Sequence, residues 1–542
     1  MGRARARLRA ASPLGARRAR GHRILRVAVA GLGPKGLSAL ERLIDHAAAL
    51  PAGARMAVDL YEPHGAPGAG PVYDPQQPAY LRMNFAADQL DLWWPESRAV
   101  PAGERLPFVA WRAASAGGDE AYPARAEAGR YLCDGFQRLL RHVPASLDVR
   151  LLPTAVRAVR PSDGRWEVVA GELSQRYDEV LVATGHERSS PTALARGWSL
   201  PAPLVPAVFP VGRMLSPDVV PPGATVAIRG FALTFIDAAL ALTEGRGGTF
   251  EPLGHPYRLR YVPGAADAGT ILPFTRSGRP MLAKPGPAVA ARAPALAAIA
   301  AAGRRRIAAL PTPVRLQEDL LPIVADCAHA SLLAAGGELA DEQLAPAEAI
   351  ERSLAVGAGL LPPGRPWALG HAWRALYPAT VARLGGDGMR AEDWPTFLRL
   401  AAELERLAFG PPPVNAAKLL ALIEAGRVDL SHVAGGTLAA SGNRAVLRSA
   451  AGERALDAVV DAVLPAPGAA GHGGLLAGLV ADGHARIAPG RRGLEVAPDA
   501  MCLALDGSLS HGLAAIGRPT EDSVIGNDTL SRGLHPQADR WA

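Results

Sequence analysis

An apolar segment in the N-terminal part of the chain leads directly into a glycine-rich turn. The turn has the pattern G-x-G-x-x-G, with glycines at Gly31, Gly33 and Gly36 and with Pro34 and Lys35 between the last two. Because glycine has no side chain, such a turn lets backbone N–H groups and a helix N-terminus approach a pyrophosphate. The pattern predicts a dinucleotide site, and we expect these five residues to bind the cofactor. The alternative is a turn that needs its glycines only for its own conformation.

The next apolar segment, residues 56–61, is followed by an acidic residue, Glu62. A carboxylate at the end of the second strand can accept the ribose hydroxyls of an adenosine, and it would repel a 2′-phosphate. Glu62 lies further from the glycines than the usual spacing of about 20 residues, and the turn at residues 51–54 absorbs the excess. The first site is therefore predicted to prefer FAD or NAD over NADP, unless Glu62 only ends a strand at the surface.

A second strand, turn and helix are predicted from residue 225 onward. Here the turn keeps only its first glycine, Gly230, because Ala232 and Phe235 occupy the other two positions. Alanine still permits a close approach of a ligand, whereas Phe235 indicates a rearranged or lost pyrophosphate site.

An arginine ends the strand that follows this second turn. The strand covers residues 270–275 and leads into Arg276 rather than into an acid. A guanidinium at this place can form a bidentate contact with a 2′-phosphate, which would select NADPH. The alternative is a surface turn that binds nothing.

These segments require a mixed α/β architecture. We predict a discontinuous Rossmann-like FAD-binding domain, a second Rossmann-like NAD(P)-binding domain and a helical insertion. The Ala- and Leu-rich spacing of the insertion predicts helices, and Trp367, His371, Trp373, Arg374 and Tyr377 within it line either a substrate cavity or a core. The predicted divisions are residues 1–24, a disordered basic tail; 25–200, the first part of the FAD-binding domain; 201–289, the NAD(P)-binding domain; 290–436, the insertion; and 437–542, the return to the FAD-binding domain.

The charge distribution excludes a nucleic-acid-binding surface on the body of the protein. The 542 residues carry a formal charge of +7, but residues 1–26 hold nine arginines and no acid, so the remainder has 49 basic and 51 acidic side chains. The three cysteines are far apart and show no metal-binding spacing, which fits a reducing cytoplasm. No run of about 18 strongly apolar residues predicts a membrane span.

Four further motifs, together with the first turn, carry a resemblance to a known family. They are G-x-G-x-x-Y at residues 68–73, an approximate N-x-x-A-x-Q-x-x-x-W from Asn84 to Trp93 that includes Gln89, A-T-G-H at residues 183–186 and G-R-P-T at residues 517–520. The chain resembles the FAD/NAD(P)-binding family of FAD-dependent urate hydroxylases and nitrosuccinate-forming L-aspartate N-monooxygenases.

The resemblance implies a cytoplasmic FAD-dependent monooxygenase that consumes NAD(P)H, with NADPH expected, and acts on O₂ and a small molecule through a flavin hydroperoxide. The substrate would be a small polar nitrogen compound, either a urate-like purine or an amino acid amine. Asn84 and Gln89 would lie at the flavin half of FAD, Gly185 at the turn where the chain leaves the sheet, and Gly517 beside the ribityl and pyrophosphate. No metal site, nucleic acid or membrane partner is expected, and no catalytic residue is assigned.

Two departures from the family pattern leave alternatives open. Arg518 stands where related flavoproteins carry an Asp that holds the ribityl hydroxyls, and Asp522 or Asp528 could substitute for it. If the Gly230 turn cannot hold a nicotinamide, the electrons must come from the substrate, as in an FAD-dependent oxidase or a reductase without oxygen transfer. A non-catalytic nucleotide-binding protein is the third interpretation.

Overall fold

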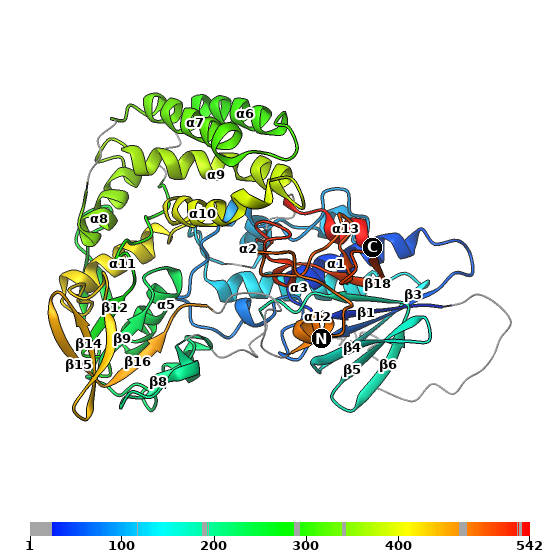
Figure 1. Ribbon diagram of the computed structural model, residues 1–542, viewed down its shortest axis with the longest axis horizontal. Helices are drawn as coiled ribbons and strands as arrows, with labels where there is room; N and C mark the ends of the chain where they lie inside the picture. Colours follow the sequence, from blue (N-terminus) through cyan, green and yellow to red (C-terminus); the bar gives the residue numbers. More distant parts are fainter. Residues whose placement is uncertain are drawn as a thin grey trace. The chain divides into compact units, whose positions relative to one another are not determined.

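The computed structural model describes residues 24–115, 117–186, 192, 194–286, 293–338, 343–464, 474–527, 529–530 and 534–542. Except for Ile24, the predicted basic tail lies outside these residues. The chain forms two compact units (Figure 1). The first unit contains residues 1–76, 85–190 and 466–542, and the second contains residues 77–84 and 191–465. Both units are therefore built from segments that are separated in sequence.

Within the described residues, the main sheet of the first unit has six strands in the order β17-β18-β7-β1-β2-β3. Neighbouring strands run parallel except β17, which pairs antiparallel with β18. Their bounds are β1 Leu25–Ala30, β2 Met56–Tyr61, β3 Leu147–Leu152, β7 Glu179–Val182, β17 Met501–Leu503 and β18 Leu509–Ala515. The carboxyl ends of β2, β1, β7 and β18 lie along one edge, which is where ligands bind in such sheets.

Helices and a small sheet complete the first unit. The helix after the first glycine turn begins at Pro34, a residue suited to the first helical position because its missing N–H would have no partner there. The helices are α1 Pro34–Ala48, α2 Phe108–Ala114, α3 Arg125–Arg141, α12 Leu475–Ala481 and α13 Gln537–Trp541. An antiparallel sheet contains β4 Val156–Ser162, β5 Arg165–Ala170 and β6 Leu173–Tyr177.

The second unit has its own parallel sheet, in the order β12-β9-β16-β8 over the described ranges. The bounds are β8 Leu204–Val205, β9 Thr225–Arg229, β12 Thr270–Phe274 and β16 Ala458–Asp461. Two antiparallel sheets accompany it: β10 Thr249–Pro252 with β11 Leu259–Val262, and β13 Thr437–Ser441, β14 Arg444–Ser449 and β15 Gly452–Leu456. This arrangement is a second Rossmann-like core.

Helices make up most of the rest of the second unit. Alanine and leucine, which favour helices, dominate the stretch that was predicted as an insertion. The helices are α4 Val211–Met214, α5 Leu233–Ala241, α6 Ala293–Ala308, α7 Leu321–Ala334, α8 Pro346–Gly357, α9 Arg365–Leu384, α10 Trp394–Ala408 and α11 Pro413–Glu424. None of the helices in the described part of the chain has the length and hydropathy that crossing a membrane would require.

The predicted mixed α/β class is confirmed, but the boundary at residue 437 needs correction. Residues 437–465 belong to the second unit, where β16 pairs with β9, and the first unit resumes at residue 466. An ion pair between Arg229 and Asp461, at 3.1 Å, accompanies this pairing. Buried parallel strands have similar apolar sequences in both sheets, so the sequence pattern of β16 did not distinguish one sheet from the other.

Candidate functional site

Two positions of the first glycine turn, residues 31–36, leave no room for a side chain. Gly31 has a φ of 102°, and a Cβ atom there would lie 2.5 Å from the carbonyl oxygen of Ala183. A Cβ atom on Gly36 would lie 2.2 Å from the carbonyl oxygen of Gly31. The Gly31 N–H donates a 3.0 Å hydrogen bond to the Tyr61 oxygen. These contacts hold the turn tightly between β1, β7 and the start of α1.

Gly33, in contrast to Gly31 and Gly36, has open space around its Cβ position. A Cβ atom on this residue would meet no atom within 4 Å, and its φ of −79° is accessible to any residue. Gly33 is the N-cap of the 15-residue helix α1 and has no side chain to occupy the space before the first turn. The positive end of a helix and its free N–H groups favour an anion at this place. The open cradle at Gly33 therefore fits the pyrophosphate of a dinucleotide.

Glu62 lies at the same edge of the sheet, immediately after β2. The residue is only 3% exposed, and its Oε1 accepts a 2.6 Å hydrogen bond from the His64 N–H. Burial raises the pKa of Glu62, while hydrogen bonds from the backbone N–H groups of His64 and Leu32 oppose this rise. The contact with Leu32, inside the first glycine turn, shows that the carboxylate faces the turn rather than the surface. This position fits an acceptor for ribose hydroxyls.

The glycine-rich loop at residues 65–73 packs on the first glycine turn. The Gly68 N–H donates a 2.7 Å hydrogen bond to the Leu32 oxygen, and a Cβ atom on Gly70 would lie 3.2 Å from the Gly33 Cα. Gly68 has a φ of 92°, and a Cβ atom there would lie 2.7 Å from the Leu132 oxygen of α3. The loop is thus fixed between α3 and the turn and forms part of the same site.

The chain leaves β7 directly beside the first glycine turn. A Cβ atom on Gly31 would lie 2.9 Å from the Thr184 Cα, and Gly185 follows with a φ of 70° and open space around its Cβ position. The Thr184 hydroxyl is buried without a hydrogen-bond partner in the described part of the chain. Buried hydroxyls normally have partners, so this one is available to a ligand. Thr184 lies within the A-T-G-H motif, but the sequence contained no separate indication that its hydroxyl could contact a ligand.

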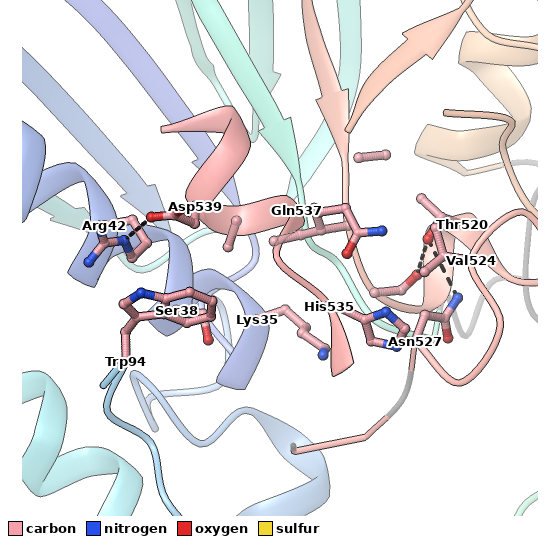
Figure 2. Close-up of a pocket in the computed structure, with 14 residues that line it drawn as sticks. Lys35, Ser38, Arg42, Trp94, Thr520, Val524, Asn527, His535, Gln537 and Asp539 are labelled. Carbon is pink, nitrogen blue, oxygen red and sulfur yellow. Dashed lines mark hydrogen bonds and ion pairs between the residues drawn. The ribbon is translucent and has the colours of Figure 1, made fainter. Parts of the chain in front are cut away.

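Gly517 follows β18 and reaches Lys35 of the first glycine turn. Its φ is 74°, and a Cβ atom there would lie 3.1 Å from the Lys35 Cγ. A pocket adjoins both residues, with about 510 Å³ of empty space that is partly continuous with solvent. Figure 2 shows Lys35 and Ser38 of α1 on one side of this pocket and His535 and Asn527 on the other. Residues that follow β18, among them Asn527 and His535, therefore line this pocket. The sequence motifs had indicated only Gly517 in this part of the chain.

The proposed substitutes for the missing ribityl-binding Asp find no support. Arg518 pairs with Glu521 at 3.0 Å. The Asp522 carboxylate accepts hydrogen bonds from the Arg492 guanidinium, at 2.7 Å for each oxygen, so it already serves a structural ion pair. Asp528 lies outside the described residues. The buried Asn527, which lines the pocket, was missed by the sequence analysis.

The two residues expected near the flavin ring fall in different units. Gln89 lies in the first unit, exposed at the end of a short 3-10 helix, next to Leu90. Leu90 lines a second pocket of about 380 Å³, which also includes Pro34 and Tyr131. Asn84 is half-buried in the segment of residues 77–84 that clusters with the second unit. Their role at the flavin stays a prediction.

The second glycine turn, residues 230–235, has nearly the same backbone conformation as the first. Gly230 has a φ of 113°, and Ala232 caps α5 in an extended conformation, as Gly33 caps α1. The backbone at these two positions shows no rearrangement, whereas pyrophosphate binding by this turn stays a prediction. Phe235 is accommodated because its ring is 1% exposed in the core of the unit, where its centroid lies 5.2 Å from that of Phe231.

Arg276 lies at the same edge of the sheet as this second turn. It follows β12, which is the parallel neighbour of β9, and the Gly230 N–H donates a 3.1 Å hydrogen bond to the Phe274 oxygen. The Arg276 side chain is exposed and makes no hydrogen bond or ion pair within the described residues, whereas the nearby Arg279 pairs with Glu403 at 2.9 Å. The structure thus brings Gly230 and Arg276 together at one strand edge.

Comparison with known proteins defines the class first. Residues 28–187 match a family described as FAD-NAD(P)-binding, and this range includes the first glycine turn, Glu62 and Gly185. These residues therefore match an FAD/NAD(P)-binding domain, in agreement with the predicted resemblance. Among the described residues, no group of three or more His, Cys, Asp or Glu side chains is placed to hold a metal ion.

Particular relatives extend the resemblance and confirm the one predicted from the sequence. The chain is 31% identical to an L-aspartate N-monooxygenase (nitrosuccinate-forming) of Streptomyces davaonensis, over 44% of this chain and 41% of that one. It is 34% identical to nitrosuccinic acid synthase npaA of Aspergillus oryzae, over 44% and 38% of the two chains. The matches thus span about two fifths of the length of these curated relatives.

A solved structure supports the fold over nearly the whole chain. L-lysine 6-monooxygenase from Pseudomonas syringae is 14% identical and superimposes with a TM-score of 0.50, covering 96% of this chain and 98% of that one.

Proposed function

We propose that this protein is an FAD-dependent, NAD(P)H-consuming monooxygenase that oxygenates the amine of a small amino acid, with L-aspartate as the first candidate substrate. One observation carries the proposal: the chain has two turns that share backbone regions at two positions, one beside a buried acid and the other beside an arginine that makes no ion pair within the described residues. An acid suits the unphosphorylated ribose of FAD, and an arginine suits the 2′-phosphate of NADPH. The named activities of the curated relatives support the choice of substrate.

The residues of the first site fit FAD, and each can be assigned a part of the cofactor to bind. The N-terminus of α1 and the open cradle at Gly33 would hold the pyrophosphate, Glu62 would accept the ribose hydroxyls, and the Lys35 ammonium would offset phosphate charge. The pocket beside Lys35 and Gly517 lies where the rest of the cofactor would extend from this cradle. When bound, FAD supplies the transfer of hydride from NAD(P)H and the activation of O₂.

The intact second turn favours an external reductant over an oxidase mechanism. An oxidase was an alternative because Phe235 was expected to disrupt that turn, yet Phe235 packs in the core, and Gly230 and Ala232 keep the backbone regions of Gly31 and Gly33. We infer that the N-terminus of α5 binds the nicotinamide dinucleotide and that Arg276 reads its 2′-phosphate.

The function is tested with purified, FAD-supplemented protein. We expect bound flavin, its reduction by NADPH without air, and NADPH consumption with O₂ that L-aspartate stimulates and that yields an N-oxygenated product. Urate and L-ornithine serve as alternative substrates. Reduction of the flavin by the substrate without NADPH would identify an oxidase instead, and failure to bind FAD would reject the proposal.

Arg276→Ala is expected to raise the KM for NADPH by roughly 10- to 100-fold, because a charge-assisted hydrogen bond contributes about 1.5–3 kcal/mol. The KM for NADH should stay the same, since NADH lacks the phosphate. Steady-state kinetics with both nucleotides measures the change. Arg279→Ala is the matched control, because Arg279 is exposed but paired with Glu403. An equal loss with NADH would show that Arg276 does not read the phosphate.

A further inference from the structure

Asn527 is a buried polar residue in the wall of the pocket beside Lys35 and Gly517. The residue is only 2% exposed, and its amide oxygen, Oδ1, has no hydrogen-bond partner in the part of the chain that the structure describes. Figure 2 shows Asn527 across the pocket from Lys35. Buried acceptors normally have a donor, and no contact within the protein accounts for this one.

Thr520 fixes the orientation of the Asn527 amide. The Thr520 hydroxyl donates its single proton to the Gly517 oxygen at 2.9 Å, so towards Asn527 it can only accept. The group that faces Thr520 must therefore be the amide nitrogen, Nδ2, which lies 3.5 Å from the hydroxyl oxygen and is joined to it by a dashed line in Figure 2. This leaves Oδ1 directed away from Thr520, as an acceptor without a donor.

Backbone contacts hold the segment that carries Asn527. The Val524 N–H donates a 2.9 Å hydrogen bond to the Thr520 oxygen. The His535 Nε2 donates to the Gly526 oxygen at 2.9 Å, because a carbonyl can only accept. Val524, Asn527 and His535 all line the pocket. The acceptor is thus positioned before any ligand binds.

The place of this acceptor along the site indicates which group it would meet. A Cβ atom on Gly517 would lie 3.1 Å from the Lys35 Cγ of the first glycine turn, so the pocket adjoins the cradle at Gly33. In FAD the pyrophosphate is joined to the ring by a ribityl chain, whose hydroxyls are hydrogen-bond donors. A cofactor whose pyrophosphate lies at the cradle would therefore bring these hydroxyls into the pocket first.

Two acids near this place already have cationic partners. Arg518, directly after the C-terminal glycine turn, pairs with Glu521 at 3.0 Å. Asp539 lies in the pocket wall, but its carboxylate accepts from the Arg42 guanidinium at 2.5 Å. The Asn527 amide oxygen is neutral and is not engaged in such a pair, so it is the acceptor that remains for a hydroxyl.

We propose that the Asn527 Oδ1 accepts a hydrogen bond from a ribityl hydroxyl of FAD, and that Thr520 is a positioning residue that holds the amide for this contact. The identity of the cofactor rests on the proposed function. Both residues lie in the first unit, so the contact does not depend on the second unit. A neutral amide oxygen would thus take the part for which the sequence analysis considered Asp522 or Asp528.

Binding of FAD and of ADP to Asn527→Leu tests the contact. FAD affinity should fall roughly two- to tenfold, which corresponds to one neutral hydrogen bond. ADP, which has no ribityl chain, should bind as it does to the unaltered protein. Isothermal titration calorimetry of the full chain, freed of flavin, measures both affinities. An unchanged FAD affinity, or an equal loss of ADP affinity, would overturn the proposal.

FAD analogues that each lack one ribityl hydroxyl identify the partner of Asn527 without relying on the stability of a variant. One of them should bind the unaltered protein roughly two- to tenfold more weakly than FAD. Asn527→Leu should bind this same analogue as well as it binds FAD. If only FAD methylated at the imide nitrogen of the ring loses its dependence on Asn527, the amide contacts the ring and the ribityl contact is rejected.

Asn415→Leu is the matched control. Asn415 is 3% exposed, its Nδ2 donates to the Tyr80 oxygen at 3.5 Å, and its Oδ1 also lacks a partner within the described ranges. It lies in α11 of the second unit, so FAD affinity should not change. A comparable loss in Asn415→Leu would show a general effect of burying leucine in place of asparagine and would contradict a specific contact at Asn527.

Stability without FAD distinguishes a ligand-binding role from a structural one. Asn527→Leu should not lower the midpoint temperature of unfolding, because it removes a buried acceptor that has no partner. Thr520 keeps its hydrogen bond to Gly517 in this variant. The rise in midpoint that a fixed concentration of FAD causes should be smaller than in the unaltered protein. A marked loss of stability without FAD would assign Asn527 a structural role instead.

The role of Thr520 is tested through its dependence on Asn527. Thr520→Val removes the hydroxyl that orients the amide and should weaken FAD binding, whereas Thr520→Ser should retain it. In the Asn527→Leu background, Thr520→Val should cause no further loss, since no amide is left to orient. Additive losses would show that Thr520 does not act through Asn527.

The catalytic assay separates failure of this contact from failure of the proposed function. If FAD affinity depends on Asn527 as expected but no amino acid is oxygenated, the proposed function fails and the ribityl contact stands. If the protein oxygenates an amino acid but binds FAD independently of Asn527, the contact fails and the proposed function stands.

Discussion

Gly36→Ala is expected to lower the unfolding temperature of the first unit by roughly 5–10 °C and to reduce the yield of folded protein. The new Cβ atom would lie 2.2 Å from the Gly31 carbonyl oxygen, so α1 and the first glycine turn must separate. Overpacking of this kind costs about 2–3 kcal/mol, and each kcal/mol shifts the midpoint by about 2–4 °C in a unit of this size. Calorimetry of the protein without added FAD measures the effect.

Gly33→Ala is the matched control, because its Cβ atom would meet nothing within 4 Å and its φ is ordinary. We expect its stability without FAD to change by less than about 0.5 kcal/mol. The added methyl group enters the open cradle before α1, so FAD affinity should fall sharply. If Gly33→Ala binds FAD as well as the unaltered protein, the pyrophosphate does not lie at this cradle.

Asp59→Leu is the second substitution with a large expected effect, a loss of about 3 kcal/mol in the stability of the first unit. Asp59 lies in β2, is 5% exposed and accepts hydrogen bonds from Arg150 at 2.8 and 2.5 Å and from the Tyr177 hydroxyl at 2.6 Å. Breaking a buried ion pair costs about 3–5 kcal/mol, and the partial exposure of Arg150 places this case at the lower end. Chemical denaturation followed by circular dichroism measures the loss.

The double variant Asp59→Leu/Arg150→Met distinguishes an unpaired charge from lost packing. Without Arg150, the only guanidinium that the structure describes near position 59 is that of Arg26, which lies 3.9 Å from the Asp59 carboxylate and is more exposed to solvent. The double variant should therefore recover about 1 kcal/mol or more relative to Asp59→Leu. If the double variant loses as much stability as Asp59→Leu and Arg150→Met lose together, the two residues are not energetically coupled.

The local parts of the site were predictable because each depends on a short stretch of chain. The first glycine turn combines a buried strand, three glycines and a helix start within residues 25–48, and this spacing, together with the acid after the next strand, predicted the dinucleotide cradle. Glu62 was predictable because β2 is the next strand and pairs with β1 in parallel. The second turn was assigned less well, since the sequence could not show that Phe235 has room in the core.

The remaining features depend on contacts between residues that are distant in sequence. Asp59 lies 91 residues from Arg150 and 118 from Tyr177, and no motif connects them. The contact of Lys284 with Phe409 and the hydrogen bonds of Arg374 to Ala408 join a loop, α9 and the end of α10, so they become visible only after folding. The boundary at residue 437 was wrong for the same reason, because strand pairing across more than 200 residues places β16 beside β9.

The placement of β18 has a consequence for how this protein is made in the cell. Residues 509–515 form the neighbour of β7 in the main sheet, so a ribosome must translate the second unit and residues up to 515 before this sheet can close. The second unit lacks only residues 77–84 from outside the stretch 191–465, so its segments emerge earlier. Domains tend to fold as they emerge during synthesis. Strands β1, β2 and β7 would therefore remain in the nascent chain with the β7 edge of their sheet unpaired until β18 is translated. The crevice for the flavin nucleotide would then be completed after the second unit.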